Sequence, residues 1–181
     1  MGKTLLLTGQ PGIGKTTIIR KVIAQLGDKA GGFYTEEIFG PGGRKGFRLI
    51  TLDGKEIVLA HKDLRDPQAP RVGRYGVDVK AFERVGVAAL QRAMQAQKLV
   101  VVDEIGMMEL FSRAFCDTVM LAILGETPVL GTVMSRPHPE SDAFKTLAQV
   151  TLWEVNQRTR DELPGRVSTW LNKQLPGNKV V

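Results

Sequence analysis

Gly9-Gln10-Pro11-Gly12-Ile13-Gly14-Lys15-Thr16 is the stretch of sequence that decides the fold. It fits the pattern G-x-x-x-x-G-K-[ST] without a gap. Its glycines permit backbone angles that other residues avoid, so the N–H groups can turn inward around phosphate oxygens. In this pattern Lys15 reaches the β- and γ-phosphates of a nucleotide, and the Thr16 hydroxyl is a ligand for Mg²⁺. The stretch therefore predicts a phosphate-binding loop.

The segments on either side are those that such a loop requires. The apolar run from Lys3 to Thr8 predicts a buried strand that ends at the first glycine. Apolar residues then recur at helical spacing, which predicts an amphipathic helix over residues 14–26 that Gly27 ends. The positive end of this helix points at the same phosphates. The order strand, loop, helix supports the interpretation of the motif.

The rest of the chain predicts an α/β fold. Residues 32–61 contain three strand-like runs separated by glycine-rich turns, and we expect an antiparallel β-hairpin insertion there, followed by a loop over 62–78. Further strands are expected at 99–102, 129–133 and 149–155, and helices at 82–94, 107–124, 139–148 and from Leu163 onward. Strands that alternate with helices predict a mainly parallel sheet with helices on both faces, the three-layer P-loop NTPase fold.

Asp103 and Glu104 follow the apolar run Leu99–Val102, where the carboxyl end of a parallel strand faces the ligand crevice. We expect Asp103 to hold the shell of Mg²⁺ together with Thr16. Glu104 is the expected general base for the attacking water. Thr132, near the end of the next strand, is a candidate to sense the γ-phosphate or to hold that water.

The composition excludes several classes of protein. The chain has 181 residues, of which 43% are hydrophobic and 24% charged, so we expect a single globular domain over 1–181. No apolar run approaches the ~20 residues of a membrane helix. The single cysteine, Cys116, cannot form an internal disulfide and does not suit a zinc cluster, which points to a cytoplasmic protein. The oligomeric state is open, with a monomer as the default expectation.

Four blocks beyond the phosphate-binding loop carry a resemblance to a known family. They are Gly32–Glu37, Arg44–Phe47, Val72–Asp78 and Asp103–Leu110, and they occur in the same order. The chain resembles the cancer-related nucleoside-triphosphatase family, small P-loop proteins first known from thermophilic prokaryotes, with a human relative. The resemblance implies a RecA-like or adenylate-kinase-like core and slow Mg²⁺-dependent hydrolysis of nucleoside triphosphates such as ATP and GTP to diphosphate and phosphate.

The resemblance also places the nucleotide contacts on the loop and around Asp103–Gly106. Members often carry Asn-Arg-Asp before the last helix, where this chain has Thr159-Arg160-Asp161, so Thr159 is a candidate helix cap. Lys15 and Glu104 are the expected catalytic residues. The expected nucleotide-binding residues are Gly9, Gln10, Pro11, Gly12, Ile13, Gly14, Lys15, Thr16, Thr17, Asp103, Glu104, Ile105, Gly106 and Arg160, with Thr16 and Asp103 as metal ligands.

Two alternatives to a hydrolase remain open from the sequence. A nucleoside or nucleotide kinase would use the same loop and Mg²⁺ site, with the segment 62–78 as a lid. A nucleotide-switched regulatory module associated with nucleic acid would suit the net charge of +6, although no base-reading motif is present. An arginine that stabilises transition-state charge would serve either transfer reaction. Its candidates are Arg44, Arg48, Arg136, Arg158 and Arg160.

Overall fold

A mixed sheet of nine strands runs through the part of the chain that the computed structural model describes, residues 3–175. The strand order is β5-β6-β4-β3-β2-β7-β8-β1-β9. The strands are β1 (Thr4–Thr8), β2 (Ala30–Gly40), β3 (Gly43–Thr51), β4 (Glu56–His61), β5 (Arg71–Val72), β6 (Tyr75–Val77), β7 (Leu99–Ile105), β8 (Val129–Val133) and β9 (Val150–Glu154). From β2 to β9 along this order the neighbours are parallel, and from β2 to β5 they are antiparallel.

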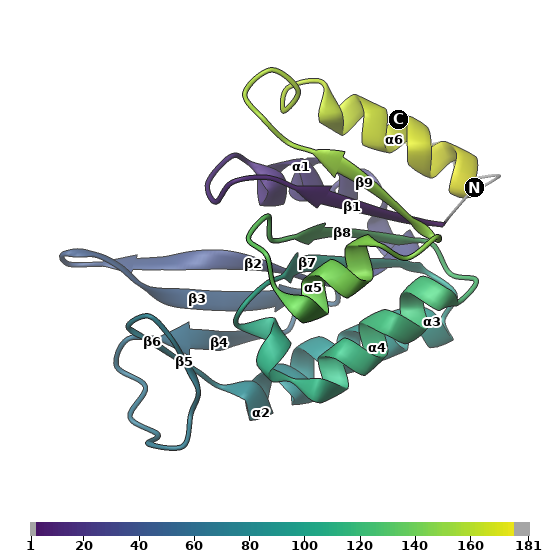
Figure 1. The fold of residues 1–181 in the computed structure, drawn as a ribbon. Coiled ribbons are helices and arrows are strands. Elements are labelled where there is room, and N and C mark those ends of the chain that lie inside the picture. Colours follow the sequence, from purple (N-terminus) through teal and green to yellow (C-terminus); the bar gives the residue numbers. More distant parts are fainter. Residues whose placement is uncertain (1–2, 176–181) are drawn as a thin grey trace.

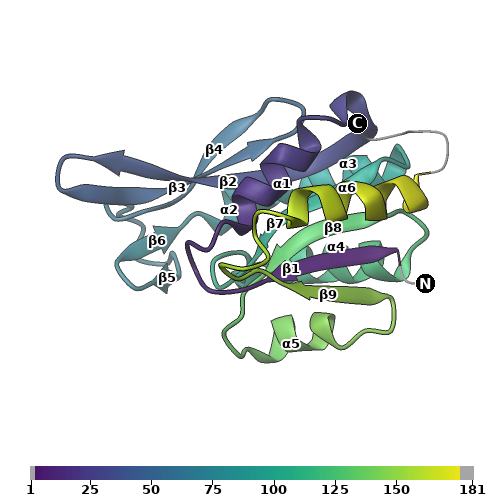
Figure 2. The same ribbon diagram turned by 90° about the horizontal axis from the view of Figure 1, so that it is seen from above.

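Helices cover both faces of the sheet, as expected for a three-layer fold (Figure 1). One face carries α1 and α6, and the other carries α2 to α5, as Figure 2 shows from above. The helical segments are α1 (Lys15–Ile23), η1 (Gly27–Lys29), α2 (Val79–Phe82), η2 (Glu83–Val87), α3 (Ala88–Gln95), η3 (Glu109–Phe111), α4 (Arg113–Leu124), α5 (Pro139–Lys145) and α6 (Leu163–Gln174).

The central strand β7 shows why two helical layers are needed. Its run Leu99–Val102 is completely buried. Val100 and Val102 pack in the core on the side of α3 and α4, whereas Leu99 and Val101 pack in the core on the side of α1 and α6. A continuous apolar run suits this position because both of its faces leave water. The sequence prediction of a doubly covered strand is confirmed.

The strand β8 lies between β1 and β7. The strand before the phosphate-binding loop and the strand of Asp103 are therefore separated by one strand. Since β1, β8 and β7 are parallel, their carboxyl ends meet at the same edge of the sheet. The residues that follow these ends are therefore brought together, although more than 90 positions separate Thr8 from Asp103.

The antiparallel region extends the sheet beyond its parallel part. β2 pairs with β7 only over Ala30–Phe33, and its remaining length pairs with β3 alone, so the two strands project as a long hairpin (Figure 1). The prediction of a loop over 62–78 is wrong at the end of this segment, because β5 and β6 form a short hairpin over 71–77 that pairs with β4. Gly73 has φ 56° in its turn, and Tyr75–Val77 are buried.

Several expected helix ends differ from the structure. α1 ends at Ile23, and Gly27 instead opens the short η1 turn, with φ 55°. The helix expected from residue 107 begins only at Arg113, because Ser112 caps it: Phe115 N–H donates to Ser112 Oγ at 3.0 Å. α5 ends at Lys145. Within residues 3–175, none of the helices combines the length and the apolar character needed to cross a bilayer.

Candidate nucleotide site at the carboxyl edge of the sheet

The phosphate-binding loop has the backbone angles that its glycines were expected to supply. Gly9, Gly12 and Gly14 have φ of 150°, 77° and 109°. A Cβ on Gly9 would lie 2.4 Å from the carbonyl oxygen of Val155, so no other residue fits there. Gly14 is the N-cap of α1, which starts at Lys15 and points its N-terminus into the loop. The loop and the helix dipole together form an anion site.

Lys15 lies folded over the loop, with only 7% of the residue exposed. Its Nζ donates to the carbonyl oxygens of Gly9 at 3.0 Å and Gln10 at 3.4 Å. The same Nζ lies 3.9 Å from Oε1 of Glu104. The ammonium group therefore joins the loop after β1 to the acidic end of β7.

Asp103 is completely buried at the end of β7, beside the neighbouring strand β8. Thr132 Oγ1, on β8, donates to Asp103 Oδ1 at 2.7 Å. Burial raises the pKa of Asp103 to about 6, although the nearby hydroxyls of Thr132 and Thr16 act to lower it. Thr132, a candidate polar residue at a strand end, therefore makes a specific contact that orients one carboxylate oxygen of Asp103.

The second carboxylate oxygen of Asp103 is a candidate ligand for the expected metal ion. Among residues 3–175, Asp103 Oδ2 has no hydrogen-bond partner, although it is buried. A buried carboxylate oxygen without a donor is costly unless a cation takes that place. Thr16 is close enough for its hydroxyl to lower the pKa of Asp103. A hydroxyl and a free carboxylate oxygen are hard oxygen ligands, so this pair fits Mg²⁺.

Glu104 is the more accessible of the two acids, with 34% of its side chain exposed. The next residue, Ile105, is in the core, and its carbonyl accepts from Met134 N–H at 3.1 Å. Ile105 therefore presents neither its side chain nor its carbonyl oxygen, and its nucleotide contact stays a prediction. A Cβ on Gly106 would lie 3.5 Å from Glu104 Cγ and 3.1 Å from Glu109 Oε2. Gly106 thus leaves room for two acidic side chains on one side of the turn.

Glu109 is a buried acid whose role could not be assigned from the sequence. It lies in η3 and is 5% exposed. Burial, and then the negative charge of Glu104, raise the pKa of Glu109 to about 8, which favours the protonated carboxyl at pH 7. The sequence carried the residue as part of a family block, but its burial depends on the packing of η3 against β7 and α2.

The turn after β9 forms the other side of the site, and sequence reasoning missed two of its residues. Asn156 and Gln157 line a hollow of about 230 Å³ together with Gln10 and Ile13 of the loop; Glu154 and Val155 complete its lining. Asn156 follows the carboxyl end of a parallel strand that pairs with β1. The rule that selected Asp103 would also have selected Asn156, had the end of this strand been treated in the same way.

Thr159 does not cap the last helix. α6 begins at Leu163, four residues later, and its N-cap is Glu162. Instead, Thr159 Oγ1 accepts from Asn156 N–H at 3.1 Å, and Thr159 N–H donates to Asn156 Oδ1 at 3.1 Å. This reciprocal pair holds the turn beside the loop. Arg160 is half-exposed, with Nε 3.6 Å from Asp161, and it is not among the residues that line the hollow, so its nucleotide contact stays a prediction.

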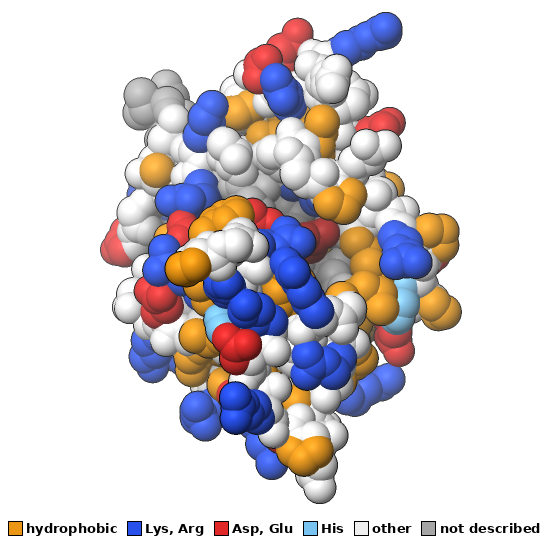
Figure 3. All heavy atoms as spheres, turned by 90° about the vertical axis from the view of Figure 1, so that its left-hand side faces the viewer, with side chains coloured by type: hydrophobic (Ala, Val, Ile, Leu, Met, Phe, Trp, Pro, Cys, Tyr) orange, Lys and Arg blue, Asp and Glu red, His pale blue; other side chains and the backbone are white. Residues whose placement is uncertain are grey.

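Two of the arginines considered for the transition state are engaged elsewhere. Arg44 on the projecting hairpin pairs with Glu37 and donates to Tyr75 Oη, and Arg48 pairs with Glu36 and Glu56. Figure 3 views the carboxyl edge of the sheet and shows acidic side chains in its central hollow, with Lys and Arg side chains gathered beside it. Arg136, Arg158 and Arg160 are exposed, and a role for any of them at the transition state stays a prediction.

The chain has a complete phosphate-binding loop after β1 and an acid at the end of the parallel strand β7, which β8 separates from β1. These features together define a P-loop nucleotide-binding protein. The family described as NTPase matches residues 4–168, and the chain belongs to this family. A nucleoside-triphosphatase THEP1 of Thermotoga sp. is 44% identical over 159 residues, which cover 88% of this chain and 90% of the relative.

Two solved structures are also similar. The crystal structure of THEP1 from Aquifex aeolicus has a TM-score of 0.84 and 34% identity, and the match covers 93% of this chain and 98% of that one. The solution structure of a human cancer-related nucleoside triphosphatase has a TM-score of 0.78 and 34% identity, over 94% and 97% of the two chains. The family resemblance read from the four sequence blocks is confirmed, and so is the P-loop NTPase fold.

Proposed function

We propose that this protein hydrolyses nucleoside triphosphates to diphosphate and phosphate, with Mg²⁺ and with a water molecule activated by Glu104. The observation that carries the proposal is the position of Glu104, whose carboxylate lies 3.9 Å from the ammonium of Lys15 at the end of β7. A base that is partly exposed there has access to solvent water on the phosphate side of the site. Membership of the NTPase family agrees with the reaction.

Different residues of the chain bind the phosphates, stabilise the developing charge and would hold the metal ion. Loop N–H groups and the N-terminus of α1 bind the phosphates, and Lys15 stabilises the charge that develops on the transferred phosphoryl group. Thr16 and Asp103 would hold Mg²⁺, which supplies charge neutralisation when bound. Thr132 keeps Asp103 oriented through its hydrogen bond.

Glu104 accepts the proton that the attacking water molecule loses in the proposed reaction. As the water oxygen attacks the γ-phosphorus, its proton passes to the Glu104 carboxylate, and the bond from phosphorus to the bridging oxygen breaks. The electron pair of that bond leaves on the diphosphate. Glu104 then returns the proton to solvent or to phosphate. The atoms balance with water as the only co-reactant.

We further propose that hydrolysis discriminates weakly between bases. Among the described residues, the hollow next to the loop is lined by Gln10, Ile13, Glu154, Val155, Asn156 and Gln157, and none of these has an aromatic ring for stacking. Amide side chains both donate and accept, so they suit more than one base edge. ATP, GTP, CTP and UTP are therefore all expected substrates.

The test is phosphate release from these four nucleotides with Mg²⁺, in the wild type and in Lys15→Ala and Glu104→Gln. We expect turnover on several nucleotides, loss of turnover in Lys15→Ala, and retained binding with roughly 10²- to 10⁴-fold slower turnover in Glu104→Gln. Lys21→Ala, an exposed lysine of α1, is the matched control and should behave as wild type.

Two results would overturn the proposal. Wild-type turnover in Glu104→Gln would remove this residue as the base. Tight nucleotide binding without phosphate release, together with transfer of phosphate to an added nucleoside or nucleotide, would identify a kinase that uses the same loop.

A further inference from the structure

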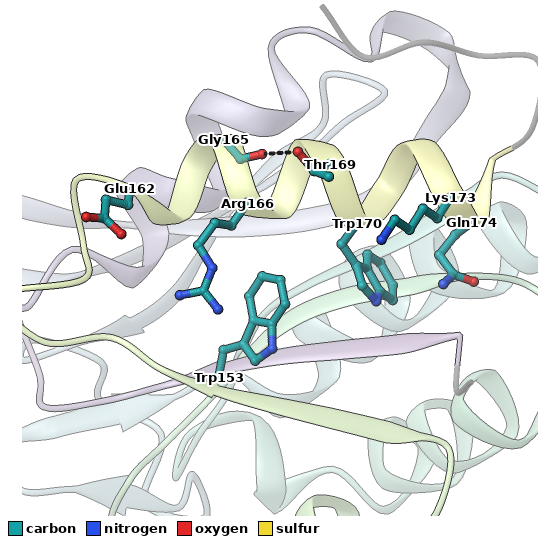
Figure 4. A pocket seen from close by; sticks show the side chains of 8 residues that line it. All are labelled: Trp153, Glu162, Gly165, Arg166, Thr169, Trp170, Lys173 and Gln174. Atoms are coloured by element: carbon teal, nitrogen blue, oxygen red, sulfur yellow. Dashed lines mark hydrogen bonds between the residues drawn. The ribbon is translucent and has the colours of Figure 1, made fainter.

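A second pocket lies between β9 and α6, on the face of the sheet that α1 and α6 cover (Figures 1 and 4). Its volume is about 450 Å³. It shares no lining residue with the phosphate-binding loop, with the acidic end of β7 or with the hollow beside Asn156. Its lining residues are Trp153, Glu162, Gly165, Arg166, Thr169, Trp170, Lys173 and Gln174. The proposed hydrolysis uses none of them.

Two indole rings form the body of the pocket. Figure 4 shows Trp153 reaching up from β9, and Arg166 and Trp170 hanging down from α6. The Arg166 guanidinium lies over the Trp153 ring, 4.7 Å from its centroid. Trp170 is only 5% exposed, and its Nε1 has no acceptor among residues 3–175. A buried indole N–H without an acceptor is unusual, because tryptophan nitrogens normally find one when they are buried.

The charges of the lining favour an anion. Arg166 and Lys173 are two turns apart on α6, roughly 10 Å along the helix axis, so a single flat ring fits between them. Among the described residues, Glu162 is the only acid in the lining, and it lies at the opposite end of the pocket from Lys173 (Figure 4). A molecule with its anionic group toward Lys173 would thus meet a cation at that end and a cation over its ring.

Gly165 keeps the pocket open. A glycine inside a helix is less stable than alanine, and this one has no positive φ that would require it. No atom lies within 4 Å of the position that its Cβ would take. The glycine is therefore not needed for packing among the described residues, and its missing side chain leaves the space beside Arg166 and Thr169 free.

We propose that this pocket binds a small planar aromatic molecule that carries an anionic group. The ring stacks against Trp153 and Trp170 beside the Arg166 guanidinium, an acceptor atom of the ligand takes the free Nε1–H, and the anionic group pairs with Lys173. The volume falls within the roughly 300–1,000 Å³ of small-molecule sites. Aromatic carboxylates and nucleoside monophosphates share this chemistry, and the site is separate from the one proposed for nucleotide hydrolysis.

The pocket supplies its own reporter, because Trp153 and Trp170 are the two tryptophans of the chain. Tryptophan fluorescence of the full chain is titrated with 1-naphthoate and, separately, with AMP. We expect a saturable change with at least one of the two, with a dissociation constant on the order of 1 mM or tighter. A response to 1-naphthoate alone selects a carboxylate, and a response to AMP alone selects a phosphate; both support the site.

Variants separate this site from other sources of a signal. Gly165→Leu, which introduces a better helix former, fills the pocket and should abolish the response. Lys173→Glu should weaken binding at least about tenfold if the ion pair forms. Lys80→Glu, the same charge change on the exposed side of α2, is the matched control and should bind as wild type.

Calorimetric titration and the rate of nucleotide hydrolysis complete the test. Gly165→Leu should retain the far-ultraviolet circular dichroism and the hydrolysis rate of the wild type while losing the heat of binding. An unchanged response in Gly165→Leu would overturn the proposal, because the signal would then come from elsewhere. The absence of a saturable change with either probe would overturn it as well.

Discussion

The two sides of the candidate nucleotide site are built in different ways. On the side of β7 and β8, Asp103 and Thr132 are both completely buried and are joined by a hydrogen bond between neighbouring strands. On the side of β9, Asn156 and Thr159 are partly exposed and are joined to each other within one turn. The first side is fixed by the sheet, whereas the second is fixed only by its own local contacts.

This difference predicts which residues of the site are sensitive to substitution and which are tolerant of it. A polar group that is buried among strands has one orientation, and a change there leaves other polar groups without partners. A polar turn at the surface can exchange its contacts for water. We therefore expect the metal and phosphate side to be sensitive to substitution and the base side to be tolerant, and the effects should decrease from one side to the other.

Glu109→Gln tests the buried side and has the largest expected effect on stability. The folded-state pKa of Glu109 is about 8, above its ordinary value, so its contribution to stability is present at low pH and is lost as pH rises toward 8. Glutamine cannot ionise, so the variant should keep its stability across this window. At pH 8 it should exceed the wild type by a few kcal/mol, about 1.4 kcal/mol for each pKa unit of the shift.

Urea unfolding at pH 5, 7 and 9 measures this difference. Glu126→Gln is the control, because the Glu126 side chain is 95% exposed, and its pH dependence should follow the wild type. Equal pH dependence of Glu109→Gln and the wild type would show that the acid is not held neutral.

Thr132→Val should have the next largest effect. The substitution preserves shape but removes the 2.7 Å hydrogen bond to Asp103 Oδ1, which leaves a buried carboxylate oxygen without its donor. The loss of about 1–2 kcal/mol corresponds to roughly tenfold in the Mg²⁺ concentration needed for half-maximal hydrolysis. Phosphate release as a function of Mg²⁺ measures it.

Thr118→Val provides the comparison for that substitution. Thr118 is a buried threonine of α4, outside the site, and its replacement should leave the Mg²⁺ dependence unchanged. If Thr132→Val also responded to Mg²⁺ as the wild type does, the hydrogen bond would have no part in holding the metal.

Asn156→Ala should have the smallest effect. It removes the acceptor for the N–H groups of Arg158 and Thr159, but water can replace it at this surface. We expect KM to change by about twofold and by the same factor for ATP and GTP, since surface substitutions usually alter free energies by less than about 0.5 kcal/mol. KM values for the two nucleotides measure it. A large loss for one base only would show that this turn selects the base.

Much of the fold could be predicted because its signals are local. The phosphate-binding loop is a continuous motif, and Val100 and its neighbours form a continuous apolar run, so each was visible within a few residues. Asp103 followed from the rule for strand ends. The short hairpin of β5 and β6 was missed because Tyr75–Val77 is stable as a strand only through its pairing with β4.

The remaining site features depend on contacts between distant segments. The burial of Glu109 depends on how η3 packs, and the pairing of Thr159 with Asn156 replaced a helix cap that spacing alone suggested. Trp153 and Trp170 are 17 positions apart in the sequence, yet a strand and a helix bring them to one pocket. Residue spacing does not contain these contacts, because it does not say which elements will face each other.

The contacts of Lys15 with the loop carbonyls have a consequence for how substrate affinity relates to rate. The ammonium already has two oxygen acceptors, Gly9 and Gln10, at 3.0 and 3.4 Å. When phosphate oxygens replace them, one set of hydrogen bonds is exchanged for another, so the resting substrate gains little. The advantage of the phosphate oxygens grows only as their negative charge increases during bond cleavage. In the proposed hydrolysis, Lys15 would thus favour passage over the barrier more than occupancy of the site.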